Sequence, residues 1–270
     1  MQSYFEAKSK IYLGTEVAIV FNEQDPKTLE AAQQADVLEG CRAIAFSLFT
    51  PQKSAVGFVE DILVDRAFLA NRAEEALEIA TESELSQIGP VSDQLRANVA
   101  AATALARAAD VPPQAIRRAI TSFKLSPHRN QPVAEVGGVL FVNDSKATNA
   151  HAANSSLSAY DSVVWIVGGL FKGVDPAELI KKHGTRLRAA VLIGSETEQL
   201  AKLFSELLPD TAISVISGDS VMRDAVLAAQ TLAEPGDTVL LAPAAASMDQ
   251  FRDYADRGES FVRAVGELSA

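Results

Sequence analysis

From Pro132 onward, short apolar runs alternate with longer segments whose apolar residues recur at helical spacing. The apolar runs predict strands at 138–142, 163–167, 190–193, 213–216 and 238–241. The segments between and after them predict helices at about 149–158, 176–182, 196–207, 219–233 and 257–268. Regular alternation of strand and helix is typical of α/β folds, so we predict a Rossmann-like, mostly parallel, doubly wound sheet.

The first part of the chain has a less regular pattern. Apolar residues between Tyr4 and Tyr12 have helical spacing, and the alternation from Ala55 to Val64 predicts an antiparallel pair that turns at Glu60–Asp61. Further strands are predicted at 17–21 and 41–46, and helices at 26–35, from 92 or 93 to 109, and 114–123. The acidic, mixed stretch 66–90 predicts only loop and short strand.

Turn and cap residues mark where several of these elements begin. Pro26 can open its helix, Thr148 or Asn149 can cap the helix that follows, and Asp219 and Ser220 can cap another. The segment 124–132 has two prolines and no periodicity, which indicates a boundary between domains at 1–126 and 127–270.

Polar residues follow three of the predicted strands directly. They lie in Asn143–Lys146, in Gly168–Gly173 and in the loop from Ala242 to Phe251. Open α/β sheets bind their ligands at the carboxyl ends of strands. If the three ends share one sheet edge, they bring lysines, an aspartate and hydroxyls together, which suits an anionic ligand.

Each of these features also has an ordinary structural interpretation. Ser247 with Gln250 fits a capping box, Gly168–Gly169 fits a turn, and Lys172 fits a solvated loop lysine. Lys8 within its predicted helix is most simply a solvated lysine too. The hypothesis of an anion site therefore depends on the three strand ends occurring together.

Composition narrows the classes of partner. The chain has 270 residues, a net charge of −11 and one cysteine, Cys41. The negative charge argues against nucleic acid, and a lone cysteine fits a reducing compartment. The sequence has no apolar run long enough for a membrane span, and its polar N-terminus lacks a signal-peptide pattern, so we expect a cytoplasmic protein.

Most catalytic motifs are missing from the sequence. The three histidines and one cysteine are scattered, and Gly-x-Ser-x-Gly, Gly-x-Gly-x-x-Gly and the P-loop pattern do not occur. The residues alone therefore predict an anion-binding α/β domain with an α+β companion and a junction that carries His128-Arg129. They do not specify a reaction.

Four motifs together resemble the Mur ligase family. These are Pro127-His128-Arg129, Asn143-Asp-Ser-Lys-Ala-Thr-Asn149, Gly168-Gly169-x-x-Lys172-Gly173, and Leu240-Leu-x-Pro-Ala-x-Ala-Ser247-x-Asp249-Gln250-Phe251 with Arg257-Gly258 beyond. The match in order and spacing runs from about 124 to 270. Residues 1–123 resemble, more weakly, the second half of the family's central α/β ATPase domain. The resemblance implies that the nucleotide-sugar domain and P-loop of such ligases lie outside this chain.

The resemblance implies ATP-dependent formation of an amide bond, in the synthesis of a peptidoglycan precursor. A substrate carboxylate would take the γ-phosphate to give an acyl phosphate, and an amine would then displace the phosphate. The Asp-Ser-Lys-Ala-Thr-Asn run favours the enzyme that adds D-glutamate to UDP-N-acetylmuramoyl-L-alanine. We expect the chain to be inactive without the missing N-terminal half.

The resemblance also implies roles for individual residues. Catalytic roles fall to Lys8, His128 and Lys146, with Lys8 as a carbamate that binds Mg²⁺. The implied ATP-binding residues are Asn98, Arg129, Asp144 and Lys146, and the implied D-glutamate-binding residues are Thr148, Lys172, Ser247 and Phe251.

Some positions depart from the family pattern. Gln94-Leu95 replaces a usual His-Asn, which puts the adenine contacts in question, and Ala242 and Ala245 replace other small residues. Two alternative functions remain open: a non-catalytic amino-acid-binding module, and a sister ligase such as folylpolyglutamate synthase.

Overall fold

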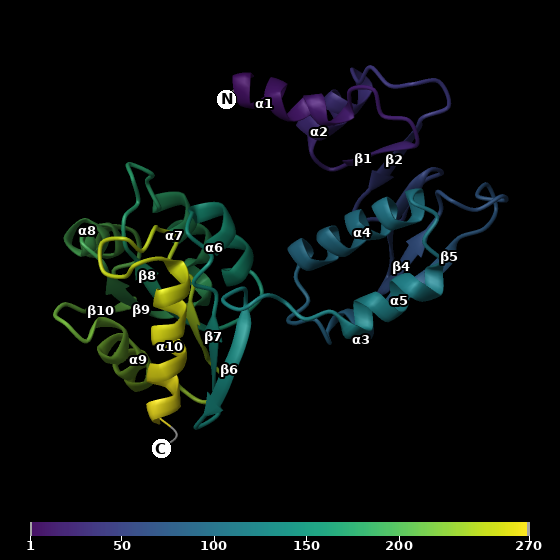
Figure 1. The fold of residues 1–270 in the computed structure, drawn as a ribbon. Helices are drawn as coiled ribbons and strands as arrows, with labels where there is room; N and C mark the ends of the chain where they lie inside the picture. Colours follow the sequence, from purple (N-terminus) through teal and green to yellow (C-terminus); the bar gives the residue numbers. More distant parts are fainter. Residues whose placement is uncertain (1, 269–270) are drawn as a thin grey trace. The chain divides into compact units, whose positions relative to one another are not determined.

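The computed structural model describes residues 2–268 and contains two compact units, Met1–Lys124 and Leu125–Ala270 (Figure 1). The division falls in the segment between the last predicted helix of the first part and Pro132. The roles expected for the two units, ATP binding and amino-acid binding, stay predictions. None of the described helices is both long and apolar enough to cross a bilayer.

The first unit is built on a five-stranded mixed sheet. Its strands are β1 (Ala18–Asn22), β2 (Arg42–Phe46), β3 (Ala55–Val59), β4 (Ile62–Asp65) and β5 (Leu77–Thr81), in the spatial order β1-β2-β3-β4-β5. β1, β2 and β3 run parallel, and β4 is antiparallel to both of its neighbours. Glu60 adopts a positive φ of 55° between β3 and β4, as a tight turn at the predicted position requires.

The helices of the first unit follow the predicted pattern closely. They are α1 (Gln2–Ser9) with the 3-10 turn η1 (Lys10–Tyr12), α2 (Pro26–Gln33), α3 (Glu82–Leu85), α4 (Asp93–Ala108) and α5 (Pro113–Ser122). Pro26 occupies the first helical position of α2, as expected. The alanine-rich α4 packs on β1, β2 and β3 through Val99, Ala100, Thr103 and Ala104, whose spacing puts them on one helix face.

The acidic stretch 66–90 contains a short strand, as predicted, and also a short helix that was not predicted. It contains β5 and the short helix α3, which begins with a capping box between Thr81 and Glu84. β5 is an edge strand with Glu78 exposed, so the hydrophobic pattern in its sequence is weak. Its hydrogen-bonded pairing with β4 stabilises it as a strand.

The second unit contains a six-stranded sheet. Its strands are β6 (Gln131–Val136), β7 (Val139–Asn143), β8 (Val163–Gly168), β9 (Leu187–Ile193), β10 (Ala212–Val215) and β11 (Thr238–Leu241), in the order β10-β9-β8-β11-β7-β6. Every neighbouring pair is parallel except β6 with β7. β6 was not expected, because Pro132 breaks the strand pattern; as an edge strand it tolerates a proline.

Helices cover both faces of this sheet (Figure 1). The helices α6 (Ala150–Leu157), α7 (Ala177–His183) and α8 (Thr197–Leu207) cover one face, and α9 (Val221–Leu232) and α10 (Tyr254–Leu268) cover the other. Trp165 packs against Phe204 in the first layer, and Phe141 and Phe261 lie in the second. A short 3-10 turn, η2 (Gly184–Arg186), precedes β9. The predicted doubly wound α/β architecture is confirmed.

Of the predicted helix caps, Asn149 is confirmed, and Ser220 has the expected position without a side-chain bond. The Asn149 side chain caps α6 by accepting from the N–H of Ala152 at 2.9 Å. Ser220 occupies the N-cap of α9 but makes no side-chain capping bond. Ser247 does not begin a helix: its carbonyl accepts from the N–H groups of Gln250 and Phe251 in a turn, and α10 starts only at Tyr254. The capping-box interpretation of Ser247 is thereby excluded.

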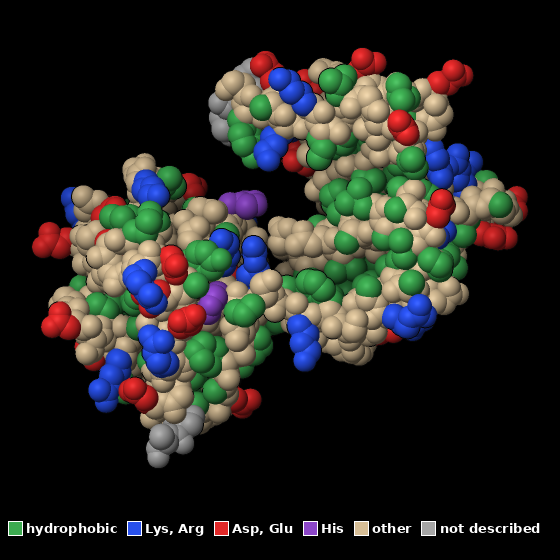
Figure 2. All heavy atoms as spheres, in the orientation of Figure 1, with side chains coloured by type: hydrophobic (Ala, Val, Ile, Leu, Met, Phe, Trp, Pro, Cys, Tyr) green, Lys and Arg blue, Asp and Glu red, His purple; other side chains and the backbone are tan. Residues whose placement is uncertain are grey.

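Charged side chains of both signs are interspersed on the visible surface of the second unit (Figure 2). Over the whole chain, 35 acidic residues outnumber 24 basic ones. A site for an anion in this unit therefore depends on cations placed locally, and the strand ends supply them.

Candidate active site at the carboxyl edge of the second sheet

The three polar strand ends lie side by side. β11 pairs with β7 on one side and β8 on the other, with Leu241 opposite Asn143 and opposite Ile166. All three strands run parallel, so their carboxyl ends open on the same edge of the sheet. The expected convergence of the three loops is confirmed by this topology.

Backbone hydrogen bonds join the loop after β11 to the other two loops. The N–H of Gly168 donates to the carbonyl of Pro243 at 3.0 Å, and that of Ala244 donates to Ala147 at 2.9 Å. Leu170 and Ala246 form an antiparallel bridge with bonds of 2.9 and 3.0 Å. The three loops therefore form one connected platform.

Gly168 and Gly169 are required by this close approach. Both have φ of 127°, a conformation that side chains rarely adopt. A Cβ on Gly168 would collide with the carbonyl of Ile193, and one on Gly169 with that of Ala246. Their role in the structure is thus to let neighbouring strand ends meet.

Asp144 is buried at the end of β7. Its Oδ1 accepts from the N–H of Asn130 at 3.0 Å, and its Oδ2 accepts from the hydroxyl of Ser156. Burial raises the pKa of this carboxyl, while those two hydrogen bonds and the positive charge of Arg129 oppose the rise. Arg129 itself is exposed.

The side-chain amide of Asn143 orients the His128 ring through a hydrogen bond. Asn143 Oδ1 accepts from the N–H of Ser145, so Nδ2 is free to donate to the carbonyl of Gly258 at 3.1 Å and to His128 Nδ1 at 3.0 Å. Since Nδ1 accepts, a neutral imidazole carries its proton on Nε2. Gly258 lies against the His128 ring, where an added Cβ would be 2.8 Å from Cγ.

A fully buried arginine, Arg257, supports the loop after β7. Arg257 donates from Nε to Ser145 Oγ at 3.0 Å, and from Nη2 to the carbonyls of Ser145 and Ala245 at 2.9 and 3.2 Å. Burial lowers the pKa of its guanidinium to about 10, and the charge of Asp249 partly opposes this. Arg257 thus links the loops after β7 and β11.

Lys146 extends from this platform with its ammonium above an aromatic ring. Lys146 Nζ lies 3.8 Å from the centroid of the Tyr254 ring, while its backbone N–H donates to the carbonyl of His128 at 3.0 Å. The rings of His128 and Tyr254 are 6.3 Å apart, edge to face. The side chain of Tyr254 therefore forms a cluster with those of His128 and Lys146.

The residues expected to bind D-glutamate differ in their surroundings. Ser247 is buried, Thr148 is half-buried, and Lys172 is exposed with a positive φ of 54°. Phe251 instead packs against the core on the α9–α10 face and lines a hollow of about 460 Å³ there. The aromatic ring next to Lys146 is that of Tyr254.

The remaining predicted residues lie in the first unit. Lys8 is exposed on α1, with Nζ 5.6 Å from the centroid of the Tyr4 ring. Asn98 is exposed on α4, where its Oδ1 accepts from Gln94 Nε2 at 2.9 Å. Residues 2–268 contain no group of three or more His, Cys, Asp or Glu side chains that could hold a metal.

Comparison with known proteins agrees with this architecture. Residues 128–245 match the family described as "Mur ligase, glutamate ligase domain". The chain is 48% identical over 270 residues to a UDP-N-acetylmuramoylalanine--D-glutamate ligase of Leifsonia xyli, and 46% identical over 272 residues to one of Streptomyces coelicolor. Residues 128–245 therefore carry a Mur ligase glutamate ligase domain, and the chain is similar to these two ligases along its whole length.

The chain spans about half the length of these ligases. The match covers 99% of this chain and 52% of the Leifsonia protein, and 100% of this chain and 57% of the Streptomyces protein. Two solved structures share the fold. A pseudomurein peptide ligase of Methanothermus fervidus has a TM-score of 0.64 at 12% identity, covering 99% of this chain and 59% of its own. A bifunctional folylpolyglutamate synthase/dihydrofolate synthase of Yersinia pestis has a TM-score of 0.61 at 19% identity. That match covers 100% of this chain and 57% of the synthase chain.

The sequence did not indicate every residue of this candidate site. Tyr254 was not singled out, because its only sequence signal is an aromatic residue between a turn and a helix. Asn143 and Arg257 occur in the motifs, but their roles depend on contacts between residues more than 100 positions apart, such as the bond from Arg257 to Ser145.

Proposed function

We propose that this chain forms part of an ATP-dependent ligase that joins D-glutamate to UDP-N-acetylmuramoyl-L-alanine. The substrate carboxylate takes the γ-phosphate to form an acyl phosphate, and the D-glutamate amine then displaces phosphate to form the amide. The reaction belongs to peptidoglycan precursor synthesis in the cytoplasm. The single observation that carries the proposal is the meeting of the Lys146, Lys172 and Ser247 loops at one sheet edge.

The proposed D-glutamate site uses a cation and hydroxyls for two carboxylates. Lys172 supplies the charge, and Ser247 and Thr148 supply hydroxyl groups. The contacts of Tyr254 favour it over Phe251 as the aromatic wall, because its ring lies below Lys146 whereas Phe251 packs into the opposite layer. The amine must sit close to the acyl phosphate, and a rigid platform of joined loops suits such positioning.

The proposed ATP side uses the residues around His128. Lys146 stabilises negative charge on the transferring phosphoryl group, Arg129 contacts the phosphates, and Asp144 contacts the ribose. His128, which carries its proton on Nε2, can donate a hydrogen bond. Asn98 contributes to adenine binding in the first unit. Gln94, which donates to Asn98 Oδ1 at 2.9 Å, is one of the two residues that stand in place of the usual His-Asn pair.

Magnesium binding is proposed through a modified lysine. Carbamylation adds CO₂ to the neutral amine of Lys8 and releases a proton, which turns a cation into a carboxylate-like oxygen ligand. The exposure of Lys8 leaves its amine accessible to CO₂. Residues 2–268 offer no acidic cluster that completes a metal site, so ATP oxygens, water and residues of a longer protein would supply the other ligands.

The first unit offers a surface for the rest of such a ligase. β1 has a strand neighbour on one side only, and large apolar side chains in the segment that precedes it are exposed. They are Tyr4 (65%), Ile11 (78%), Leu13 (66%) and Val17 (59%). Apolar groups around an open sheet edge favour docking of further polypeptide, and we propose the N-terminal half of the same enzyme as the partner.

Phosphate release tests the proposal. The assay contains ATP, Mg²⁺, bicarbonate, UDP-N-acetylmuramoyl-L-alanine and D-glutamate, with a control that lacks D-glutamate. We expect no turnover by the chain alone, and D-glutamate-dependent turnover when the N-terminal half of a relative is added.

Two other outcomes select the alternatives. Turnover with L-glutamate in place of D-glutamate would favour a sister ligase such as folylpolyglutamate synthase. Binding of D-glutamate without turnover, even with the N-terminal half present, would favour a non-catalytic amino-acid-binding module. Turnover by the chain alone would contradict the need for a partner.

A further inference from the structure

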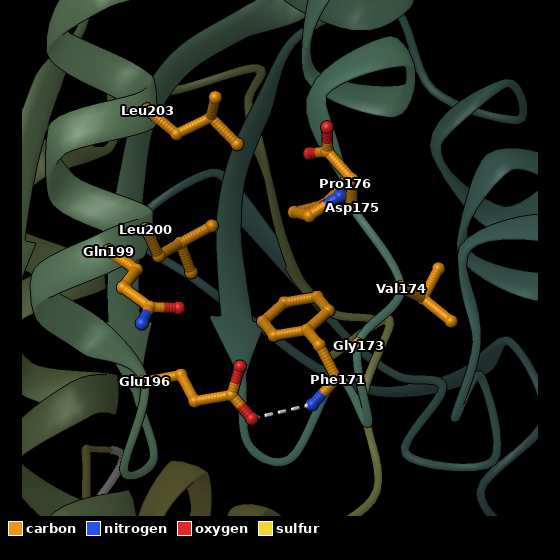
Figure 3. Close-up of a pocket in the computed structure, with 9 residues that line it drawn as sticks. All are labelled: Phe171, Gly173, Val174, Asp175, Pro176, Glu196, Gln199, Leu200 and Leu203. Atoms are coloured by element: carbon orange, nitrogen blue, oxygen red, sulfur yellow. Dashed lines mark hydrogen bonds between the residues drawn. The ribbon is translucent and has the colours of Figure 1, made fainter.

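The loop between β9 and α8 carries none of the proposed ligand-binding residues, yet it is hydrogen-bonded to the loops that carry Lys172 and Ser247. Glu196, the N-cap residue of α8, accepts from the N–H of Phe171 at 3.0 Å through Oε1 (Figure 3). Its neighbour Ser195 donates its N–H to Asp249 Oδ2 at 2.8 Å. Phe171 precedes Lys172, and Asp249 lies two residues after Ser247.

Lys172 needs such support because its own side chain has none. Within residues 2–268 its ammonium makes no hydrogen bond or ion pair, and its φ of 54° is costly for a residue other than glycine. Its placement therefore depends on the neighbouring Phe171. The Phe171 ring is buried in the core, and its N–H is held by Glu196.

The Ser247 loop is tied to the same segment. Asp249 sits in the turn that the carbonyl of Ser247 closes. Gly194 fits tightly between the two loops: an added Cβ would lie 2.9 Å from Asp249 Oδ2 and collide with the backbone of Gly169. The segment 194–196 is thus packed and hydrogen-bonded to both loops.

We propose that Glu196, with Asp249, is a positioning residue that fixes Lys172 relative to Ser247. The inference deepens the proposed function and rests on it, since it assumes that Lys172 and Ser247 bind the carboxylates of D-glutamate. Glu196 itself touches no ligand. A cavity of about 310 Å³ lies beside the bond, lined by Leu200 and Leu203 of α8 and by Val174 and Pro176 (Figure 3). Once the bond from Phe171 to Glu196 is lost, this cavity leaves the Lys172 loop room to move.

The test measures amide exchange and D-glutamate binding by NMR on this chain. In Glu196→Ala we expect the Phe171 amide to exchange at least ~10-fold faster, and D-glutamate to bind ~10-fold more weakly, as for loss of a hydrogen bond to a charged group. Glu196→Gln keeps an acceptor oxygen and should restore both within about threefold. Glu198→Ala is the matched control, because it removes an exposed carboxylate from the same helix turn.

The outcomes separate this proposal from the proposed function. Unchanged Phe171 exchange in Glu196→Ala, or faster exchange with unchanged D-glutamate affinity, would overturn the positioning role. If wild type and Lys172→Ala fail equally to bind D-glutamate, the proposed site itself is wrong, and the exchange data still decide whether Glu196 holds the loop. An equal effect of Glu198→Ala would show that helix charge, not the bond, is responsible.

Discussion

Lys146 Nζ lies 3.8 Å from the centroid of the Tyr254 ring, so a cation of the loop after β7 rests on the first residue of α10. A cation at this distance over an aromatic face is attracted by the ring, by about 1 kcal/mol for a partly exposed pair. The pair joins two segments that are far apart in the sequence and fixes the direction of the lysine.

Replacement of the Tyr254 ring should therefore slow the proposed reaction. We expect Tyr254→Leu to lower D-glutamate-dependent phosphate release by the reconstituted ligase about fivefold, the effect of losing ~1 kcal/mol. Tyr254→Phe keeps the aromatic face and should stay close to the wild-type rate. If Tyr254→Phe is as slow as Tyr254→Leu, the lower rate comes from loss of the hydroxyl and not of the ring.

Gly258 should tolerate no side chain. A Cβ would overlap the His128 ring, so Gly258→Ala should lower the free energy of unfolding by about 2 kcal/mol. Gly266 is the matched control, since it lies in the same helix with nothing within 4 Å of an added Cβ. Gly266→Ala should stabilise by about 0.5–1 kcal/mol through reduced backbone entropy. Urea unfolding followed by the fluorescence of the buried Trp165 reports on this unit.

His183 should make the second unit sensitive to acid. Burial lowers the pKa of its imidazole to about 4, with Lys182 and Arg186 adding to the effect. The unfolded chain binds this proton first, near pH 6.5, so stability is lost as the pH falls from about 6.5 to about 4. The loss amounts to about 3 kcal/mol for a shift of this size.

Urea unfolding at several pH values tests this linkage. His183→Gln can keep a bond to Asn154, the wild-type partner of Nε2 at 3.0 Å, but cannot titrate. We expect a flatter pH profile for this variant over the same range. The exposed His151 provides the control, and His151→Gln should leave the wild-type profile unchanged. Equal flattening by both variants would contradict the assignment to His183.

Arg107 should be needed for the stability of the first unit. Its Nε donates at 2.8 Å to Asp65, which is fully buried. Arg107→Ala leaves that carboxylate without its cation and should cost about 3–5 kcal/mol. Arg117→Ala, which removes an exposed partner of Glu84, should change stability far less. Hydrogen exchange in β3 and β4 would resolve the difference, and comparable losses in both variants would contradict it.

Periodicity alone predicted most of the architecture. The strands of the second unit have fully buried apolar runs, such as Val163–Gly168, and its helices have apolar faces, so local sequence indicates both. β6 was not predicted, and the short strand β5 was predicted without bounds, because each is an edge strand whose pairing, and not its composition, makes it a strand. The cap at Asn149 was predicted from residue type, whereas Ser247 had the same signature and begins only a turn.

The sequence by itself determined the fold class and three of the loops of the candidate site, because polar residues at the ends of apolar runs are a local signal. Only the tertiary structure decided that β11 lies between β7 and β8, that Tyr254 and not Phe251 meets Lys146, and that Glu196 holds Phe171. Those facts depend on strand order and on contacts across long separations in the chain, and hydrophobic periodicity carries no information on either.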